Sequence, residues 1–127
     1  MSWKDQYEHA AGQELQAYEN QSIDALLRAV QQGQFGQYNM IWTALSDQAT
    51  LDEAGWVLFG VLQQDKLDYL IRCNCAEALL ELLERDDVLA ILDEATNLSR
   101  GSAAQQTPYL HALRLELCSR IGEPPAH

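Results

Sequence analysis

The sequence predicts an all-α protein built from about seven short helices. Apolar residues recur at the spacing of three and four that is typical of helices through nearly the whole chain, whereas the alternating runs that indicate strands are absent. Prolines occur only at Pro108, Pro124 and Pro125. Because 47% of the 127 residues are hydrophobic, the chain is long and apolar enough for one core. We therefore expect a single helical domain over residues 1–122 and a flexible C-terminal tail over residues 123–127.

Three helices are expected before residue 50. Ser2 and Asp5 mark the start of the first helix, which ends at a break over residues 20–22. The second helix has apolar residues at i, i+3, i+4 and i+7, namely Ile23, Leu26, Leu27 and Val30. Gly33 is its expected stop, and helical spacing returns after Gly36. The apolar residues of the third helix are Tyr38, Ile41, Trp42 and Leu45.

The clearest helix start lies at Thr50. Thr50 and Glu53 have the spacing of a capping box, in which each side chain bonds the main-chain N–H of the other residue. Gly55 and Gly60 lie inside the helix that follows, where glycine lowers stability. We therefore expect a neighbouring helix to approach closely at these glycines, which places this helix centrally in the fold.

The segment from Asp68 to Leu83 is too apolar for a helix that buries a single stripe. Its broad apolar arc contains Leu67, Ile71, Cys75, Ala78, Leu79 and Leu82. Its polar residues are confined to a narrower strip that contains Cys73, Glu77, Glu81 and Glu84. A helix with this profile contacts neighbours on two sides, so we expect it to be a central packing element.

Two more helices are expected before the tail. Asp86 and Asp87 cap a helix whose apolar residues are Val88, Ile91, Leu92, Ala95 and Leu98. Thr107 with Pro108 is a strong start for the last helix, because proline fits the first helical position. The apolar residues of this helix are Leu110, Leu113, Leu117 and Ile121, and it is expected to end at Gly122.

The order of residue types from Ile71 to Leu82 resembles the second helix of a HEAT repeat, which typically has a Val-Arg pair, two small residues, an Ala-Leu pair and a final leucine. The matching residues are Ile71 and Arg72, Cys75 and Ala76, Ala78 and Leu79, and Leu82. The resemblance implies antiparallel helix pairs stacked into a HEAT- or armadillo-like right-handed superhelix, which binds partners along the surface lined by second helices. An irregular helical bundle is the alternative, because any amphipathic helix rich in alanine and leucine shows a similar pattern.

The chain is strongly acidic, with 19 aspartates and glutamates against 8 lysines and arginines and a formal net charge of −11. This charge repels nucleic acid phosphates and anionic membrane surfaces, so we expect neither as a partner. It attracts a basic protein, or it serves solubility alone. The N-terminal residues lack the apolar run of a signal peptide, and three cysteines do not indicate a disulfide scaffold. We therefore expect a cytoplasmic protein.

Motifs for chemistry are scarce. Cys73 and Cys75 point roughly 200° apart on a helix and so do not share a metal ion. The three histidines form no ligand pattern, and the sequence contains no glycine-rich phosphate loop and no nucleophile motif. We therefore expect no enzymatic activity, no metal and no cofactor.

The predicted partner-binding residues combine apolar and acidic side chains. They are Leu70, Cys73, Glu77, Leu80, Glu81, Glu84, Asp86 and Asp87. Carboxylates interleaved with apolar groups suit a basic protein surface, so we expect a small non-enzymatic binding module, such as an immunity or inhibitor protein or an adaptor. One alternative is a binder of a small molecule or pigment, with a cavity lined by Trp42, Trp56, Phe59 and Tyr69. A homo-oligomeric structural protein is another.

Overall fold

The computed structural model describes residues 2–125, and all regular structure within them is α-helical. The helices are α1 (Trp3–Glu19), α2 (Ile23–Gln31), α3 (Met40–Gln48), α4 (Leu51–Leu62), α5 (Tyr69–Leu82), α6 (Val88–Ser99) and α7 (Ala103–Ile121). The expected class, an all-helical chain with seven helices, is confirmed for this part of the sequence. No helix among residues 2–125 combines the length and the apolar character of a membrane span.

Most of the helices begin after a residue whose side chain accepts a main-chain hydrogen bond. These capping residues are Ser2, Ser22, Thr50, Asp68, Asp87 and Ser102. The predicted capping box is present: the N–H of Glu53 donates to Thr50 Oγ1 at 3.2 Å, and the N–H of Thr50 donates to Glu53 Oε1 at 2.9 Å. Such bonds satisfy N–H groups that have no partner inside the helix, which fixes where the helix begins.

The last helix begins earlier than the sequence pattern indicates. A second capping box, formed by Ser102 and Gln105, starts α7 at Ala103, so that Pro108 lies inside the helix. The predicted start at Thr107 is therefore wrong. The two hydrogen bonds of the capping box compensate for the one main-chain bond that a proline removes from a helix.

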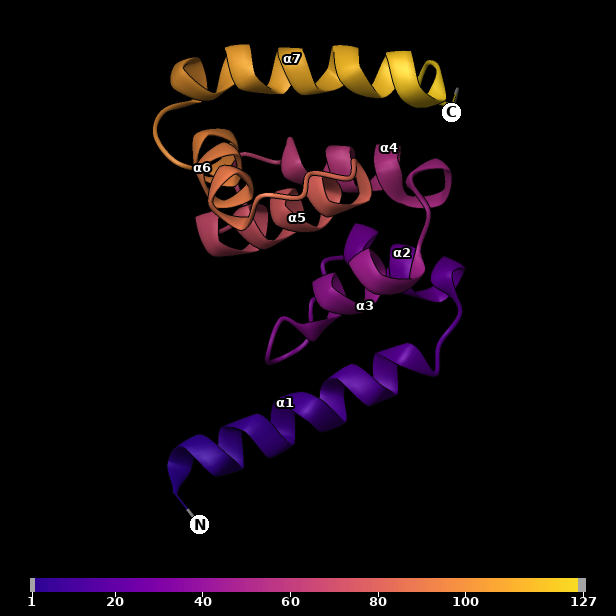
Figure 1. Cartoon of the computed structure of the whole chain (residues 1–127), viewed down its shortest axis with the longest axis vertical. Helices are drawn as coiled ribbons and strands as arrows, with labels where there is room; N and C mark the ends of the chain where they lie inside the picture. Colours follow the sequence, from indigo (N-terminus) through magenta and orange to yellow (C-terminus); the bar gives the residue numbers. More distant parts are fainter. Residues whose placement is uncertain (1, 126–127) are drawn as a thin grey trace.

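The helices form an elongated stack with α1 at one end and α7 at the other (Figure 1). Helix α1 packs on α3, α2 packs on α4, and α3 packs on α5. Each of these three helices thus contacts the helix two positions further along the chain. The order changes after α5, because α7 contacts α4 in addition to the preceding helix α6. The described residues thus form a helical bundle.

The central packing element is α5, as predicted, because α3, α4 and α6 all pack against it. Its side chains Cys75, Ala76, Leu79 and Leu80 are each 0% exposed. They join a core whose largest fully buried members from other helices are Leu26, Ile41, Leu45, Leu58, Leu62, Leu98 and Leu117. Contacts with three helices leave only a narrow part of the α5 surface open.

The two glycines of α4 have different surroundings. A Cβ atom on buried Gly55 would lie 2.9 Å from Ile121 Cδ1 and 3.5 Å from Leu117 Cδ2, so the predicted close approach of a neighbouring helix is confirmed there, with α7 as the neighbour. Gly60 is exposed, and a Cβ atom on it would meet nothing within 4 Å. The same prediction is therefore wrong for Gly60, which faces an open groove instead of a helix.

The connection between α2 and α3 is held by a carboxylate from α1. Glu14 accepts hydrogen bonds from the main-chain N–H of Gln37 at 2.7 Å and from those of Tyr38 and Met40 at 3.1 Å. Asn39, which precedes α3, has φ 59° and makes no side-chain capping bond. Glu14 therefore supplies the cap of α3 from another helix, and this fixes α1 against α3.

Candidate functional site

The predicted partner-binding residues differ in their exposure. Leu70, Glu81, Glu84, Asp86 and Asp87 are exposed, and Cys73 and Glu77 are half-buried. Leu80 is 0% exposed and belongs to the core, so its expected place on an exposed strip is wrong. The prediction of an exposed strip assumed that neighbours contact α5 on two sides. Three helices contact α5 instead, and this additional packing covers Leu80.

The remaining strip borders a small hollow between α3 and α5, with a volume of about 80 Å³. The hollow is lined by Asn39, Trp42, Thr43, Ser46, Asn74, Glu77, Ala78 and Glu81. Glu77 and Glu81 were predicted from the sequence, whereas the polar residues of α3 were not. Only the packing of α3 on α5 brings these two sets of side chains together.

The carboxylate of Glu77 sits in an unfavourable position for a charge. Burial raises its pKa above the usual value, and the neighbouring carboxylate of Glu81 adds to this increase, while the thiol of Cys73 opposes it. The Cys73 Sγ lies 3.7 Å from Glu77 Oε1, and burial raises the pKa of this thiol as well. The charged form of Glu77 therefore lacks a compensating cation in the described part of the chain.

A second group of predicted residues lies where α5 ends and α6 begins. We name Glu84, Asp86, Asp87, Val88 and Leu89 the acidic corner. Val88 and Leu89 are 69% and 76% exposed. Leu92, which like Val88 belongs to the apolar residues named for this helix, is 44% exposed, because only the side of α6 that holds Ile91, Ala95 and Leu98 packs inward. The corner thus joins three carboxylates to two open aliphatic side chains.

The backbone of the acidic corner is partly strained. Glu84 has φ 66°, in the left-handed region that favours glycine, because the chain reverses there after α5. The N–H of Arg85 donates to Leu80 O at 3.2 Å and closes this turn. Asp87 has a structural task as the cap of α6, since it accepts the N–H of Leu89 at 3.1 Å.

Arg85, which lies between Glu84 and Asp86 in the chain, forms ion pairs with carboxylates outside the acidic corner. Its Nη1 and Nη2 each donate to Glu116 at 2.7 Å, and its Nε donates to Glu94 at 3.2 Å. These bonds hold the pKa of Arg85 above its usual value and the pKa of Glu116 below. Within residues 2–125, the carboxylates of Glu81, Glu84 and Asp86 form no ion pair or hydrogen bond. The local cation therefore does not neutralise them.

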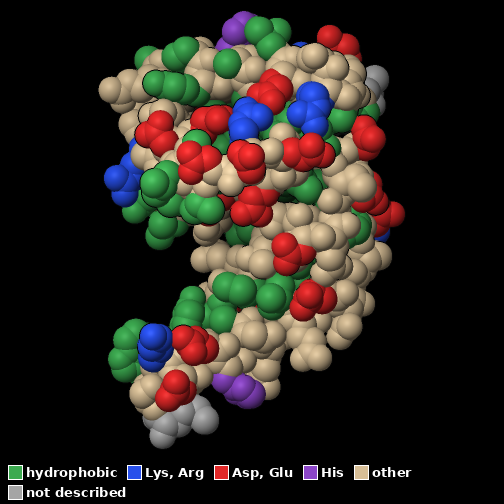
Figure 2. All heavy atoms as spheres, viewed as in Figure 1, with side chains coloured by type: hydrophobic (Ala, Val, Ile, Leu, Met, Phe, Trp, Pro, Cys, Tyr) green, Lys and Arg blue, Asp and Glu red, His purple; other side chains and the backbone are tan. Residues whose placement is uncertain are grey.

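The acidic residues are numerous on the face that carries α5, α6 and α7. Figure 2 shows Asp and Glu side chains spread across this face, with few Lys and Arg side chains among them. The same view shows a recess between α1 and the rest of the molecule. A basic surface that approaches the molecule from this side would meet several carboxylates.

Cys73 and Cys75 do not share a common site. Cys75 is buried and its Sγ donates to Leu58 O at 3.1 Å, whereas Cys73 is half-buried beside Glu77. Among residues 2–125, no three His, Cys, Asp or Glu side chains are placed to hold one metal ion. The cysteines on the two sides of α5 thus have separate surroundings.

Of the four aromatic residues considered for a ligand cavity, Trp56 and Phe59 pack edge to face with ring centroids 5.7 Å apart, but the four do not line one common cavity. Trp42 and Phe59 are 3% and 4% exposed, and the ring of Trp42 stacks on Phe35. Tyr69 lies on the surface below the guanidinium of Arg100. Trp56 borders one groove, of about 400 Å³, and Tyr69 borders a different one, of about 320 Å³, so the described residues do not assemble the cavity expected from the sequence.

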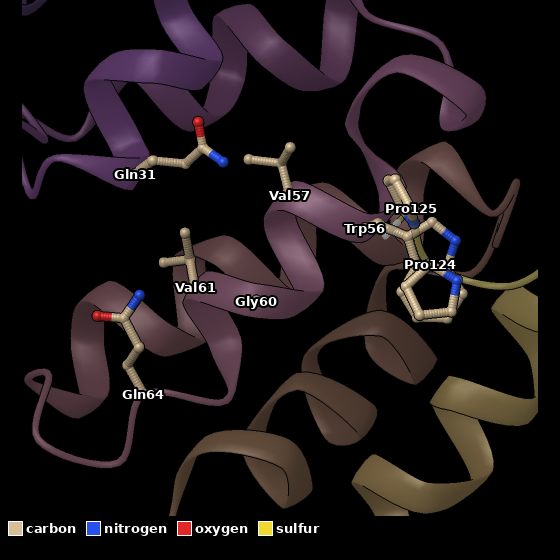
Figure 3. A pocket seen from close by; sticks show the side chains of 8 residues that line it. All are labelled: Gln31, Trp56, Val57, Gly60, Val61, Gln64, Pro124 and Pro125. Carbon is tan, nitrogen blue, oxygen red and sulfur yellow. The ribbon is translucent and has the colours of Figure 1, made fainter. Parts of the chain in front are cut away.

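The groove beside Trp56 has a volume of about 400 Å³ and runs along α4. Val57, Gly60 and Val61 form its floor, with Gln31 and Gln64 at the sides (Figure 3). Pro124 and Pro125 lie next to Trp56 at one end of it. These two prolines belong to the predicted tail, of which residues 126 and 127 lie outside the described part.

In comparisons with protein-family models, with curated protein sequences and with solved structures, no significant match to this chain was found.

Proposed function

We propose that this chain is a non-enzymatic module that binds a basic protein through the exposed acidic surface of α5 and the acidic corner. The main support for this proposal is that Arg85 forms ion pairs with Glu94 and Glu116. Because that cation is used elsewhere, Glu81, Glu84 and Asp86 present their full charge to solvent. A basic partner would supply the missing counter-charges.

The exposed apolar residues next to these carboxylates support the same proposal. Interfaces combine a desolvated apolar centre with polar groups around it. Val88 and Leu89 supply aliphatic surface directly after Asp86 and Asp87 in the chain. A protein that masks the basic surface of another, such as an immunity or inhibitor protein, or an adaptor, would use this combination.

The packing order of the first five helices supports a HEAT-like stack as the scaffold for this surface. In such a stack, alternate helices form two layers, and the contacts of α1 with α3, α3 with α5 and α2 with α4 follow that order. The contact of α7 with α4 departs from it, because it joins helices three positions apart in the chain. We propose the HEAT-like arrangement for α1–α5 only.

Capture of the partner with charge-reversed variants tests the proposed function. The chain, immobilised at about 0.15 M salt, is exposed to a lysate of its source cells, and the captured protein is purified and titrated calorimetrically. We expect a basic protein whose affinity falls at least tenfold with Glu81→Lys plus Glu84→Lys, but by less than threefold with the matched pair Glu8→Lys plus Glu19→Lys on α1. Equal affinities for the two variants, or capture of no protein, would overturn the proposal.

A second candidate function, small-molecule binding, is favoured by the groove beside Trp56. Its volume of about 400 Å³ lies in the range of ligand pockets, and its floor is apolar. A ligand found by a thermal-shift screen should lose binding in Gly60→Leu, which fills the groove, and keep it in Gly12→Leu. Both glycines are helical and have no atom within 4 Å of an added Cβ. Binding that survives Gly60→Leu would dismiss this candidate.

A further inference from the structure

The groove that Tyr69 borders is a pocket in which opposite charges face one space. It lies where the connection between α4 and α5, helix α5 and the start of α7 meet, and its volume is about 320 Å³. Its walls include Asp65, Tyr69, Arg72, Gly101, Ala103 and Gln106. None of these residues lines the groove beside Trp56 or carries the acidic surface of the proposed function. We name this feature the Arg72 pocket.

Arg72 brings a buried positive charge to the pocket. It is only 3% exposed, and its Nε donates to Leu62 O and its Nη2 to Gln106 Oε1, both at 2.8 Å. Its Nη1 makes no hydrogen bond within residues 2–125, yet it is not sealed from solvent in the way that Trp42 Nε1 is. The guanidinium is thus held in place with one donor group left for a molecule in the pocket.

The charge of Arg72 has no counter-charge in direct contact. No ion pair within residues 2–125 involves Arg72, although buried arginines are usually paired. Burial lowers the pKa of Arg72, and the carboxylate of Asp65 opposes this change without approaching to the distance of an ion pair. Because both residues line the same pocket, a small molecule in it can lie between the two charges.

The start of α7 adds a donor for a negative group. Ala103 is the first residue of α7, and its N–H makes no hydrogen bond within the described residues, since Ser102 accepts N–H groups from further along the helix. Such free N–H groups and the helix dipole favour an anion. A second guanidinium lies beside the pocket wall, because Arg100 Nη2 donates to Tyr69 Oη at 3.2 Å. A carboxylate in the pocket would therefore meet a positive potential.

We propose that the Arg72 pocket binds a free α-amino acid as a zwitterion. The carboxylate would accept hydrogen bonds from Arg72 Nη1 and from the N–H of Ala103, and the ammonium group would pair with Asp65. A simple anion suits the pocket less well, because Asp65 would repel it. The volume of about 320 Å³ lies at the lower end of the range of ligand pockets, as a small ligand requires.

Titration with three matched probes tests the class of ligand. L-Alanine carries both charged groups, propionate lacks the ammonium group, and ethylammonium lacks the carboxylate. The ¹⁵N-labelled full chain is titrated with each probe at constant ionic strength, and binding is followed at the assigned amide signal of Gly101, which lines the pocket. We expect a saturable shift with L-alanine and binding that is weaker by about tenfold or more with each of the other two probes.

The carboxylate end is tested by Ala103→Pro. Proline removes the free N–H and suits the first position of a helix, so α7 is retained. We expect about fivefold weaker binding of both L-alanine and propionate. The matched variant Trp3→Pro, at the first position of α1 after another serine cap, should change neither affinity. Unchanged binding of both probes in Ala103→Pro would reject the start of α7 as the place of the carboxylate.

The ammonium end is tested by Asp65→Asn, which keeps the shape of the side chain and removes its charge. We expect about tenfold weaker binding of L-alanine, whereas propionate should bind no more weakly than before because a repelling charge is gone. The matched variant Asp47→Asn, at an exposed position of α3, should leave both affinities unchanged. Dispersed amide signals show that each variant is folded.

The outcomes separate the ligand class from the pocket itself. Equal affinities for L-alanine and propionate, or unchanged L-alanine binding in Asp65→Asn, would overturn the zwitterion as the ligand. No saturable shift of the Gly101 signal with L-alanine would overturn the pocket as an amino-acid site. This inference is independent of the proposed function, because neither Glu81 nor Glu84 lines the Arg72 pocket.

Discussion

Arg72 on α5 donates a hydrogen bond of 2.8 Å from Nη2 to the side-chain oxygen of Gln106 on α7, and both side chains are buried. The Nε of Arg72 also donates to Leu62 O, at the end of α4, at 2.8 Å. The Nε2 of Gln106 in turn donates to Ser99 O, Arg100 O and Gly101 O at 3.1–3.3 Å, after the end of α6. Arg72 Nη2 also donates to Leu98 O near the end of α6, at 3.5 Å, so the positive charge of Arg72 is stabilised by carbonyl groups at the ends of two helices.

Replacement of Arg72 should therefore be strongly destabilising. Arg72→Met leaves Leu62 O and Gln106 Oε1 without their buried donor, and we expect the free energy of unfolding to fall by about 3 kcal/mol or more. Urea denaturation, monitored by circular dichroism, measures this change in the free energy of unfolding. The control Arg28→Met, at an exposed position of α2, should change it by less than about 0.5 kcal/mol. If Arg72→Met does not fold, Gln106→Met provides the milder test, and an unchanged stability in that variant would contradict the prediction.

The turn before α3 offers a matched comparison of two glycines. Gly33 and Gly36 both have φ 78°, but a Cβ atom would meet nothing within 4 Å at Gly33, whereas at Gly36 it would collide with Tyr18 Oη and lie 3.0 Å from Glu14 Cδ. Alanine should cost about 1 kcal/mol at Gly33, from the left-handed backbone alone. At Gly36 we expect a clearly larger loss in denaturant unfolding, because Glu14 can no longer hold its main-chain bonds. Equal losses would contradict this prediction and would show that Tyr18 and Glu14 move aside without loss of the main-chain bonds.

Glu84 should be replaceable by glycine with a gain in stability. Its φ of 66° is costly for a residue with a Cβ atom, so Glu84→Gly should raise the free energy of unfolding by about 1 kcal/mol. Glu81→Gly, inside α5, should lower it by a similar amount, about 1 kcal/mol. Thermal and urea unfolding of both variants check the opposite signs. A loss of stability in Glu84→Gly would mean that the carboxylate makes a favourable contact.

The ion pair of Arg85 with Glu116 predicts a defined pH dependence. Hydrogen bonds from Arg85 hold the pKa of Glu116 below its usual value of 4.5 in the folded chain. The pair therefore stabilises the fold above that pH, and this contribution disappears as the pH falls through the lower, folded-state pKa. We expect Glu116→Gln to reduce stability by about 1 kcal/mol at pH 7, since both groups are partly exposed.

The decisive measurement is the difference between the wild type and Glu116→Gln along a pH series of urea unfolding curves. This difference should shrink as the pH falls below about 4, where the carboxylate becomes protonated in both folded and unfolded chains. The control Glu8→Gln, on the exposed side of α1, should show no such dependence. A difference that is constant from neutral to acidic pH would rule out the ion pair as its source.

The sequence predicted individual residues best where their role depends on near neighbours in the chain. The capping box of Thr50 and Glu53 and the burial of Cys75 were both predicted and are present. Gly55 was correctly expected to allow a close helix approach, but Gly60 was not distinguishable from it. Both glycines break the same local rule, and only the position of α7 decides which one meets a neighbour.

For the candidate site, the sequence identified the carboxylates of α5 but not their surroundings. Leu80 and Glu81 are adjacent in the chain, and the packing of three helices around α5 buries the first and leaves the second open. The residues of α3 that complete the hollow carry no local signal, because Asn39 and Asn74 lie 35 positions apart in the numbering of the chain. Their proximity is a property of the packing alone.

The sequence by itself determined that the chain forms helices, because main-chain bonds four residues apart and caps three residues apart are set by local residue types. It also determined the excess of negative charge. The tertiary structure decided which charges remain unpaired: Arg85, in the connection between α5 and α6, reaches Glu94 on α6 and Glu116 on α7 and so leaves Glu81 and Glu84 unpaired. Burial and ion pairing depend on which helix faces meet, and these contacts join residues far apart in the chain.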